Sequence, residues 1–532
     1  MSKARFTFDY IVVGAGSAGA VVAARLSESG KRTVLLIEAG KESHSILTRM
    51  PAALAFPLSD ERILWSYETG PEPHLADRRI AHVRGKALGG SSTINGMVFV
   101  RGNAKDYAGW AADGLTQWSY EKCLPYFRKL EDYDGGSSEL RGSGGPVRIT
   151  TCKAEGRIFD AFLEAGQQYG LELNSDYNGR TQEGVHTYQA NIDRGVRAST
   201  SHAYLRGAAG RNNLSILQTA TVDKIDFDGK RAVSVTVSFA GEKRKYYARE
   251  EIIVCCGAYE SPQLLMRSGI GNRVELGKAG VACIADVPGV GQNLHDHPCV
   301  PVGYAASIKG VSTVAHLNKL KMAAIGVEWL FFKTGLGATN FWEVGSFFKS
   351  SDDAQYCDIQ HEFIPMIGDF THGSQDLHDG FLYQTCLMRP RSRGSVTLAS
   401  GDPKSRAKIV HNYLEHPQDA RDLANGIRRT LEMIKQKAWD SVRGEPQGPD
   451  LTVMSDTGLH EWMKQNVSTQ YHPCGTCKMG YDDASVVDEE GRVNETDALR
   501  VIDASIMPCI TSGNINAPTM MIAEKISEAI QA

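Results

Sequence analysis

The first hydrophobic run of the chain is short, apolar at every position and interrupted by glycine. Residues 10–13 (YIVV) are typical of a parallel strand buried on both faces, because such strands show no polar alternation. A helical pattern then extends to about Glu28, and a second apolar run over residues 33–37 ends at Glu38. The order of strand, glycine turn, helix and strand predicts a βαβ unit and therefore a parallel sheet.

The turn after the first strand carries three glycines with the spacing G-x-G-x-x-G. Gly14 permits the tight turn, Gly16 lets the backbone approach a pyrophosphate, and Gly19 lets the helix pack on the strand. Glu38 lies 19 residues beyond Gly19, where a carboxylate can accept hydrogen bonds from ribose hydroxyls. This pattern predicts a dinucleotide site. It does not separate NAD from FAD, so an NAD-dependent dehydrogenase is one alternative.

Later segments predict further elements by the same rules. Strands are expected at NLSIL (213–217), QTATVDKI (218–225) and EEIIVC (250–255). Pro518 suits the first turn of a last helix that should extend to about Ile530. Residues 319–335 (KLKMAAIGVEWLFFKTG) form an amphipathic pattern. We favour a buried lid or core helix for this segment, and a helix at a membrane surface is the alternative.

Length, charge and cysteine usage limit the class of protein. At 532 residues the chain is too long for one ordinary core, so two lobes are expected. A formal net charge of −4 provides no basic surface for nucleic acid. No stretch reaches the roughly 20 apolar residues that a membrane span needs, and the N-terminal run is too short for a secretory signal. The 11 cysteines lie mostly in apolar runs, which favours a reducing cytoplasm over a disulfide framework.

Two more glycine-rich segments are long and specific. They are RGKALGGSSTINGMVFVRGNAKDY (84–107) and GAYESPQLLMRSGIG (257–271). In this order they resemble the paired signatures of the glucose–methanol–choline (GMC) flavoprotein oxidoreductases, and the resemblance covers about residues 8–530. WSYETGPEPHLADRRI, YHPCGTCKMG and VIDASIMP are most similar to the choline-oxidising members of that family.

The resemblance implies a mixed α/β and α+β fold with two lobes. A Rossmann-like FAD-binding lobe would comprise the discontinuous segments 1–155, 195–305 and 460–532. A substrate lobe would comprise 156–194 and 306–459, built on an antiparallel sheet flanked by helices. Members that attach FAD covalently use a histidine where this chain has Ile94, so we expect non-covalent FAD. The implied cofactor-binding residues are Gly14, Gly16, Ser17, Gly19, Glu38, Ala39, Gly89, Gly90, Ser91, Asn95, Gly96, Val222, Asp503 and Ala504.

The segment YHPCGTCKMG (471–480) combines a histidine with two cysteines. Cys474 and Cys477 form one C-x-x-C, but no second pair with suitable spacing completes a zinc site, so we favour packing over metal binding or thiol redox chemistry. His472 matches the family histidine that faces the substrate side of the flavin. Its partner should be Asn516, 44 residues later, which matches the other active-site position. Asn514 is expected only to form a turn.

The resemblance implies oxidation of a small primary alcohol to the aldehyde. His472 would accept the hydroxyl proton, Asn516 would hold the alkoxide, and hydride would pass to the flavin. A non-redox lyase that keeps FAD as a structural group is a rival from the same fold.

A choline-like substrate is favoured. In choline-oxidising members an acidic residue in a matching stretch meets the trimethylammonium group, so Glu343 and Trp342 are expected to bind substrate. His372 aligns with a second active-site histidine, and His378 and His361 compete for that role. Those members usually have SNHFE where this chain has TNFWE, so another aromatic, aliphatic or anionic primary alcohol is an alternative.

No sequence motif identifies the molecule that takes electrons from the reduced flavin. Oxygen and a quinone or electron-transfer protein are both candidate acceptors, and a homodimer is a candidate assembly. We expect a cytoplasmic protein, with peripheral membrane association as the alternative.

Overall fold

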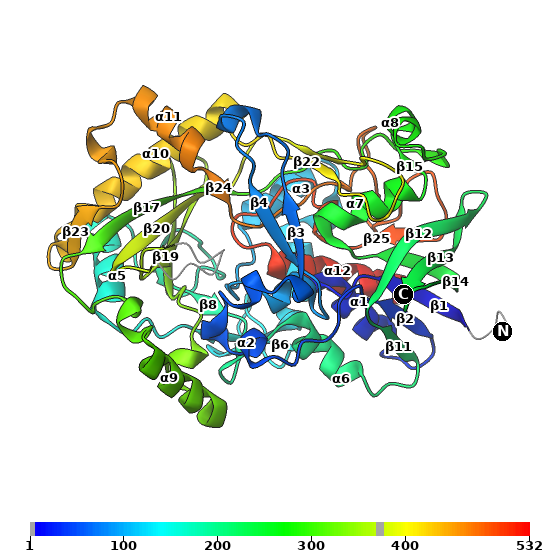
Figure 1. The fold of residues 1–532 in the computed structure, drawn as a ribbon, viewed down its shortest axis with the longest axis horizontal. Helices are drawn as coiled ribbons and strands as arrows, with labels where there is room; N and C mark the ends of the chain where they lie inside the picture. The colour runs from blue at the N-terminus through cyan, green and yellow to red at the C-terminus, as the bar shows by residue number, and fades with distance from the viewer. Residues whose placement is uncertain (1–5, 369–376) are drawn as a thin grey trace.

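A computed structural model of the chain describes residues 6–368 and 377–532. Two large sheets lie toward opposite ends of the molecule (Figure 1). The first has the order β11-β2-β1-β14-β13-β12, with β25 paired to β14. Its strands are β1 (Thr7–Val13), β2 (Val34–Ile37), β11 (Leu214–Leu217), β12 (Ala220–Asp228), β13 (Arg231–Phe239), β14 (Glu242–Val254) and β25 (Leu499–Val501).

The predicted βαβ unit is confirmed. β1 pairs in parallel with β2 on one side and with β14 on the other, and helix α1 (Ser17–Leu26) follows the glycine turn. Positions 10–13 of β1 are all buried, as the continuous apolar run predicts. A Cβ on Gly19 would lie 1.8 Å from the carbonyl oxygen of Gly14, so glycine is required where α1 crosses the turn.

The second sheet is antiparallel, in the order β23-β17-β20-β19-β18-β7 with β24 paired to β17. Helices α5 (Arg157–Tyr169) and α10 (Pro417–Ile434) pack on it. Our boundaries placed β17 and β24 with the first lobe, but both pair in this sheet. Its strands are β7 (Gly184–Thr187), β17 (Pro298–Ala306), β18 (Val344–Phe348), β19 (Ile359–Ile364), β20 (Gly380–Leu387), β23 (Arg443–Pro446) and β24 (Ser468–Thr469).

The last helix, α12 (Asn516–Gln531), lies near the middle of the molecule and packs against α1 and α4 (Tyr120–Leu130) (Figure 1). Pro518 lies in its first turn, as predicted. The remaining helices and strands are α2 (Ile46–Arg49), β3 (Leu64–Glu68), β4 (Ala81–Gly85), α3 (Ala104–Ala112), β5 (Glu131–Tyr133), β6 (Val147–Thr151), β8 (Gln189–Ala190), β9 (Ile192–Asp193), β10 (Val196–Arg197), α6 (Arg206–Ala208), α7 (Gly257–Arg267), β15 (Ile270–Gly271), α8 (Arg273–Lys278), β16 (Ala285–Asp286), β21 (Ser395–Thr397), β22 (Lys408–Val410) and α11 (Asp456–Asn466).

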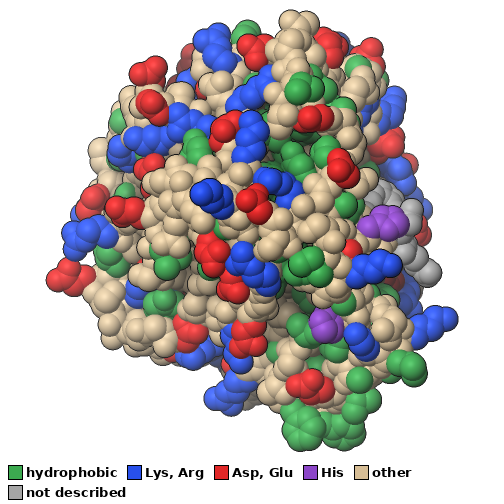
Figure 2. All heavy atoms as spheres, turned by 90° about the vertical axis from the view of Figure 1, so that its left-hand side faces the viewer, with side chains coloured by type: hydrophobic (Ala, Val, Ile, Leu, Met, Phe, Trp, Pro, Cys, Tyr) green, Lys and Arg blue, Asp and Glu red, His purple; other side chains and the backbone are tan. Residues whose placement is uncertain are grey.

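Helix α9 (Lys319–Phe332) corrects one expectation. We favoured a buried helix here, but α9 projects from the body of the molecule, and Trp329 is its one buried side chain (Figure 1). Its exposed apolar side chains include Leu320 (85% exposed), Phe331 (71%) and Phe332 (72%). Figure 2 views the molecule from the left-hand side of Figure 1. Hydrophobic side chains gather at its lower end, where Figure 1 places α9. Within the described residues, every helix is too short or too polar to cross a bilayer.

The contact between the two glycine loops can be tested directly. A Cβ on Gly90, whose φ is +51°, would lie 2.6 Å from the Cα of Gly16. We therefore expect Gly90→Ala to lower the free energy of unfolding by about 2–4 kcal/mol, because it combines a left-handed backbone with a backbone clash. Thermal unfolding followed by circular dichroism measures the effect. Gly207→Ala is the matched control, since no heavy atom lies within 4 Å of a Cβ there. Equal melting temperatures for the two variants would contradict the close contact.

Candidate functional site

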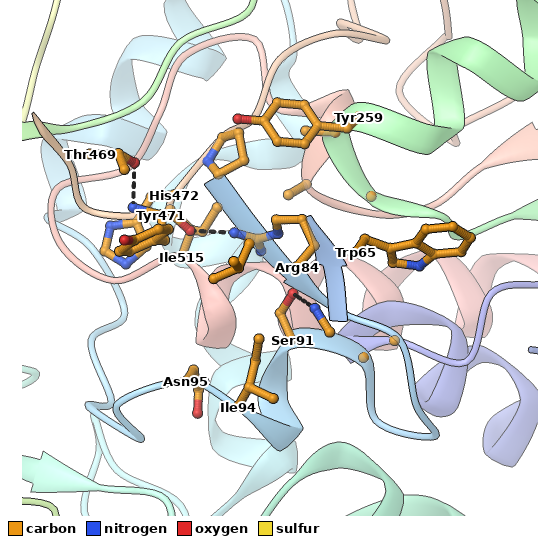
Figure 3. A pocket seen from close by; sticks show the side chains of 18 of the residues that line it. Trp65, Arg84, Ser91, Ile94, Asn95, Tyr259, Thr469, Tyr471, His472 and Ile515 are labelled. Atoms are coloured by element: carbon orange, nitrogen blue, oxygen red, sulfur yellow. Dashed lines mark hydrogen bonds between the residues drawn. The ribbon is translucent and has the colours of Figure 1, made fainter. Parts of the chain in front are cut away.

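A cavity of about 910 Å³ extends from the glycine turn after β1 to one face of the second sheet. Its wall combines the start of α1, the loop around Gly90, the segment around His472 and the start of α12. From the second sheet it receives alternate residues of β19 and β20. Figure 3 shows Arg84, Tyr259, Tyr471 and His472 around this space, with Ser91, Ile94 and Asn95 below them.

Most of the expected cofactor-binding residues line this one cavity. Gly19 and Gly89 do not line the cavity. Gly19 lets α1 pack against the glycine turn, and Gly89 forms the turn before Gly90. Gly89 has a φ of +94° and donates its N–H to the carbonyl of Ala15. The residues on the cavity wall are Gly14, Gly16, Ser17, Glu38, Ala39, Gly90, Ser91, Asn95, Gly96, Val222, Asp503 and Ala504.

This wall fits a dinucleotide. The Glu38 carboxylate is 6% exposed and accepts hydrogen bonds from the backbone N–H groups of Ala15 and Gly40, both at 2.8 Å, which fixes its position beside Ala39. Asp503 is held in the same way by Gly257 N–H at 2.8 Å. Fixed carboxylates and closely approaching glycine backbone suit ribose hydroxyls and a pyrophosphate. FAD therefore fits the residues present.

The residue before His472 has a left-handed backbone conformation. Tyr471 has a φ of +62°, and its carbonyl accepts a hydrogen bond from Nη1 of Arg84 at 2.6 Å. The N–H of His472 donates to Oδ1 of Asp296 at 2.7 Å. These two bonds hold both polar groups of the peptide bond that precedes His472, so the main chain that carries the imidazole is fixed before any substrate binds.

Hydrogen bonding also fixes the tautomer of His472. The neighbouring His297 has its Nε2 3.1 Å from the carbonyl oxygen of Met388, and a carbonyl only accepts, so this Nε2 carries hydrogen. Burial lowers the pKa of His297 to about 3, so its ring is neutral and its Nδ1 is an acceptor. Nδ1 of His472 lies 3.1 Å from that atom and must donate. Nε2 of His472 is thus left as a lone pair.

The imidazole of His472 is uncharged under ordinary conditions. Burial lowers its pKa well below the usual 6.5, and the positive charge of Arg84 acts in the same direction. The amide Nδ2 of Asn514 lies 3.3 Å from Nε2 of His472 and can donate to it. This arrangement is a neutral base whose free nitrogen sits beside an amide donor.

The structure brings His472 into contact with a different asparagine from the one expected. Asn514, which we assigned to turn formation, is the residue in contact with the imidazole. Asn516 instead accepts a hydrogen bond from the hydroxyl of Ser17 at 2.7 Å, and so ties the start of α12 to the glycine turn. Both asparagines line the cavity. Their order reverses because the chain enters α12 at Asn516, so the preceding loop carries Asn514 toward His472.

The expected substrate residues are only partly placed at the cavity. Trp342 lines it, whereas Glu343 does not: its carboxylate accepts from the hydroxyl of Thr339 on the far side of the chain. Neighbouring positions in an extended segment point in opposite directions, and Trp342 takes the cavity side. His372 lies outside the described residues. His361 is buried on the opposite face of β19, bonded to Ser346 and Thr430.

Several polar cavity residues were missed from the sequence, and two of them belong to the second sheet. Glu362 on β19 and Gln384 on β20 are directly opposite each other in the antiparallel register, and both line the cavity. The segment QHEFI has three polar residues followed by two apolar ones, so it gives no alternation that would assign Glu362 to a cavity face. The strand order that brings the pair together is not local information.

Cys474 and Cys477 are both fully buried within the core that surrounds β1 and α12. Burial raises the pKa of both thiols. Such thiols are protonated and act as compact apolar groups, which is what packing predicts.

Comparisons with known proteins agree with this geometry. The GMC oxidoreductase family model matches residues 8–299 with its N-terminal part and 390–523 with its C-terminal part. The oxygen-dependent choline dehydrogenase of Paraburkholderia phytofirmans is 46% identical over 528 residues, covering 98% of this chain and 94% of that protein. That of Pseudomonas syringae pv. tomato is 46% identical over 533 residues, covering 98% and 93%.

Solved structures share the fold over nearly the whole chain. Pyridoxine 4-oxidase from Mesorbium loti superposes with a TM-score of 0.89 at 30% identity, covering 98% of this chain and 99% of that chain. A formate oxidase variant from Aspergillus oryzae gives a TM-score of 0.93 at 26% identity, covering 99% and 98%. With a cavity that fits FAD and a neutral histidine at its wall, the chain belongs to the GMC oxidoreductase family and is an FAD-dependent alcohol oxidoreductase.

Proposed function

We propose that this enzyme oxidises a small, positively charged primary alcohol to the aldehyde, with His472 as the base. The observation that carries the proposal is the unprotonated Nε2 of His472 at the cavity wall, which is an acceptor contacted by the amide of Asn514 at 3.3 Å. The 46% identity to proteins described as choline dehydrogenases supports a choline-like cation. Bound FAD supplies the acceptor for the hydride that leaves the alcohol carbon.

The residues around His472 have separate tasks in this reaction. Nε2 of His472 removes the hydroxyl proton, which makes expulsion of hydride from the carbon far easier. Asn514 donates from Nδ2 to the oxygen that becomes an alkoxide, since this amide is the donor bonded to the base. His297 holds the tautomer, and Asn516 at the start of α12 holds the loop through Ser17.

Removing the base should abolish most turnover while leaving the flavin bound. We expect His472→Ala to lower kcat at least ~10²-fold, the usual scale of general base catalysis, in a steady-state assay with choline and other small primary alcohols. His44→Ala is the control, because that side chain is 82% exposed. A near-normal rate in flavin-loaded His472→Ala would refute the assignment. Failure of every alcohol to bleach the flavin anaerobically would favour the lyase instead.

The pH dependence should report the lowered pKa of His472. A base must be unprotonated, and its pKa lies well below 6.5, so kcat/KM should stay constant as pH falls through 6.5 and decline only at lower pH. The profile is measured over the pH range in which the holoenzyme keeps its flavin. An acidic limb centred at or above 6.5 contradicts a buried neutral imidazole as the base.

We further propose that α9 rests on an anionic membrane surface. Exposed contiguous apolar surface of this kind is uncommon on soluble proteins. Lys319 and Lys321 lie in its first turn, where the helix dipole disfavours cations, and Lys333 caps its end. Lysines at both ends of an apolar helix suit lipid headgroups around buried side chains.

A membrane location would also bear on the electron acceptor. The turn after α9 (Gly335–Ala338) packs on residues Pro51–Ala53, and the adjacent Leu54 lines the cavity. A bilayer beneath α9 would therefore lie near one side of the cavity. This supports a membrane quinone as an acceptor, beside oxygen.

Vesicle co-sedimentation tests the membrane contact. We expect the enzyme to pellet with vesicles containing phosphatidylglycerol, and Phe331→Ser with Phe332→Ser to weaken the partition coefficient at least about tenfold, because two large apolar side chains are lost. Val453→Ser, at an 81% exposed apolar site elsewhere, is the matched control. Wild-type protein that stays in the supernatant, or that light scattering shows to be a dimer broken by the Phe changes, contradicts the proposal.

A further inference from the structure

Strands β19 and β20 each contribute one polar and one apolar side chain to the cavity wall. Glu362 and Gln384 are opposite neighbours on β19 and β20. The next cavity-facing pair, Ile364 and Leu382, is apolar, as is Pro301 beyond Gln384 on β17. Side chains opposite each other in an antiparallel pair have Cβ atoms about 4.5–5.5 Å apart, so the carboxylate and the amide form one polar spot.

The Glu362 carboxylate has no cationic partner among the described residues. It is 7% exposed, and its Oε1 accepts a hydrogen bond from Nδ2 of Asn514 at 2.9 Å. The amide of Gln470 also stabilises it, whereas burial raises its pKa. Two neutral amides compensate a buried carboxylate only partly, and such groups normally have a cation nearby. A cationic ligand would supply that charge.

Gln384 adds a requirement for a hydrogen-bond donor. Its Oε1 is buried and accepts no hydrogen bond in the described part of the chain. Leaving a buried acceptor without a donor costs about 1–3 kcal/mol. An ammonium group with at least one N–H can donate to this oxygen while its charge faces Glu362. A quaternary ammonium has no N–H and leaves the oxygen unsatisfied.

The small number of aromatic side chains on the second-sheet side of the cavity also favours an ammonium group that carries an N–H. Trp342 is the one aromatic side chain that the described residues 306–459 contribute to the cavity wall. Recognition of a quaternary ammonium typically uses several ring faces around the cation. One ring beside a carboxylate and a free amide oxygen suits a smaller cation that forms hydrogen bonds.

Asn514 lies between the Glu362 carboxylate and the imidazole of His472. Its Nδ2 lies 2.9 Å from Oε1 of Glu362 and 3.3 Å from Nε2 of His472. The carboxylate and the base are therefore within two hydrogen-bond lengths of each other. A substrate that reaches both must carry its cation and its hydroxyl on neighbouring carbons.

We propose that Glu362 and Gln384 form the cation subsite of this enzyme and select a short amino alcohol whose ammonium group carries an N–H. This rests on the proposed alcohol oxidation by His472 and names its substrate class. Glu343 takes no part in it, since its carboxylate is directed to Thr339 outside the cavity.

Anaerobic flavin reduction in the purified holoenzyme tests the subsite with four alcohols. They are 2-aminoethanol, N,N-dimethylaminoethanol, choline and 3,3-dimethylbutan-1-ol, which is the uncharged analogue of choline. Wild-type enzyme should reduce its flavin with the two N–H-bearing ammonium alcohols at least about tenfold more efficiently than with choline, as expected for one satisfied buried acceptor. Glu362→Gln should lose about 10- to 100-fold on the charged alcohols and little on 3,3-dimethylbutan-1-ol.

Two further variants separate the alternatives. Gln384→Met should bring N,N-dimethylaminoethanol and choline close to equal, because the acceptor for the N–H is gone. Glu343→Gln should match wild type on all four alcohols. Equal losses on charged and uncharged alcohols in Glu362→Gln would mean that Glu362 only positions Asn514, and would overturn the subsite while leaving alcohol oxidation intact. A wild-type preference for choline overturns the N–H requirement. If no alcohol reduces the wild-type flavin, the proposed function itself fails.

Discussion

The Asp296 carboxylate is the group on which the arrangement of the site depends. Its Oδ1 accepts the N–H of His472 at 2.7 Å and that of His297 at 2.9 Å, so one oxygen sets the main chain of both histidines. Its Oδ2 accepts from the hydroxyls of Tyr413 and Thr469. Burial raises the pKa of this carboxyl, and the four donors oppose that shift. A fully satisfied buried carboxylate gives rigid positions to the rings attached to it.

Behind Asp296 lies a second buried group that could be mistaken for a metal site. His82, Asp296 and His411 offer ligand atoms within 4.8 Å of one another. The hydroxyl of Tyr259, however, bridges the two imidazoles, at 2.9 Å from His82 and 2.8 Å from His411. Burial lowers the pKa of both rings, and neutral imidazoles can share one hydroxyl as donor and acceptor. This cluster supports the wall behind His472 through the hydrogen bonds of Tyr259.

The cavity joins groups with opposite requirements. Its reacting end holds an uncharged base, kept neutral by burial and by the nearby Arg84 cation. Its sheet end holds a carboxylate, Glu362, whose charge lacks a partner among the described residues. Asn514 hydrogen-bonds to both and separates them by a neutral amide. The carboxylate would favour a protonated imidazole, so the amide of Asn514 between the two groups helps to keep His472 neutral, and a cation bound at Glu362 would act in the same direction as Arg84.

Local pattern determined the βαβ unit, the glycine turn after β1 and the last helix, because strand burial, positive φ and the restricted backbone of proline are properties of a few adjacent residues. The place of His472 came from the resemblance of its segment to the family motif. Only the tertiary structure decided which asparagine meets His472, which glutamate faces the cavity and that α9 is exposed. Each of these depends on the direction of one side chain relative to segments far away in sequence. A shift of one position along a strand or loop reverses that direction without changing the local pattern.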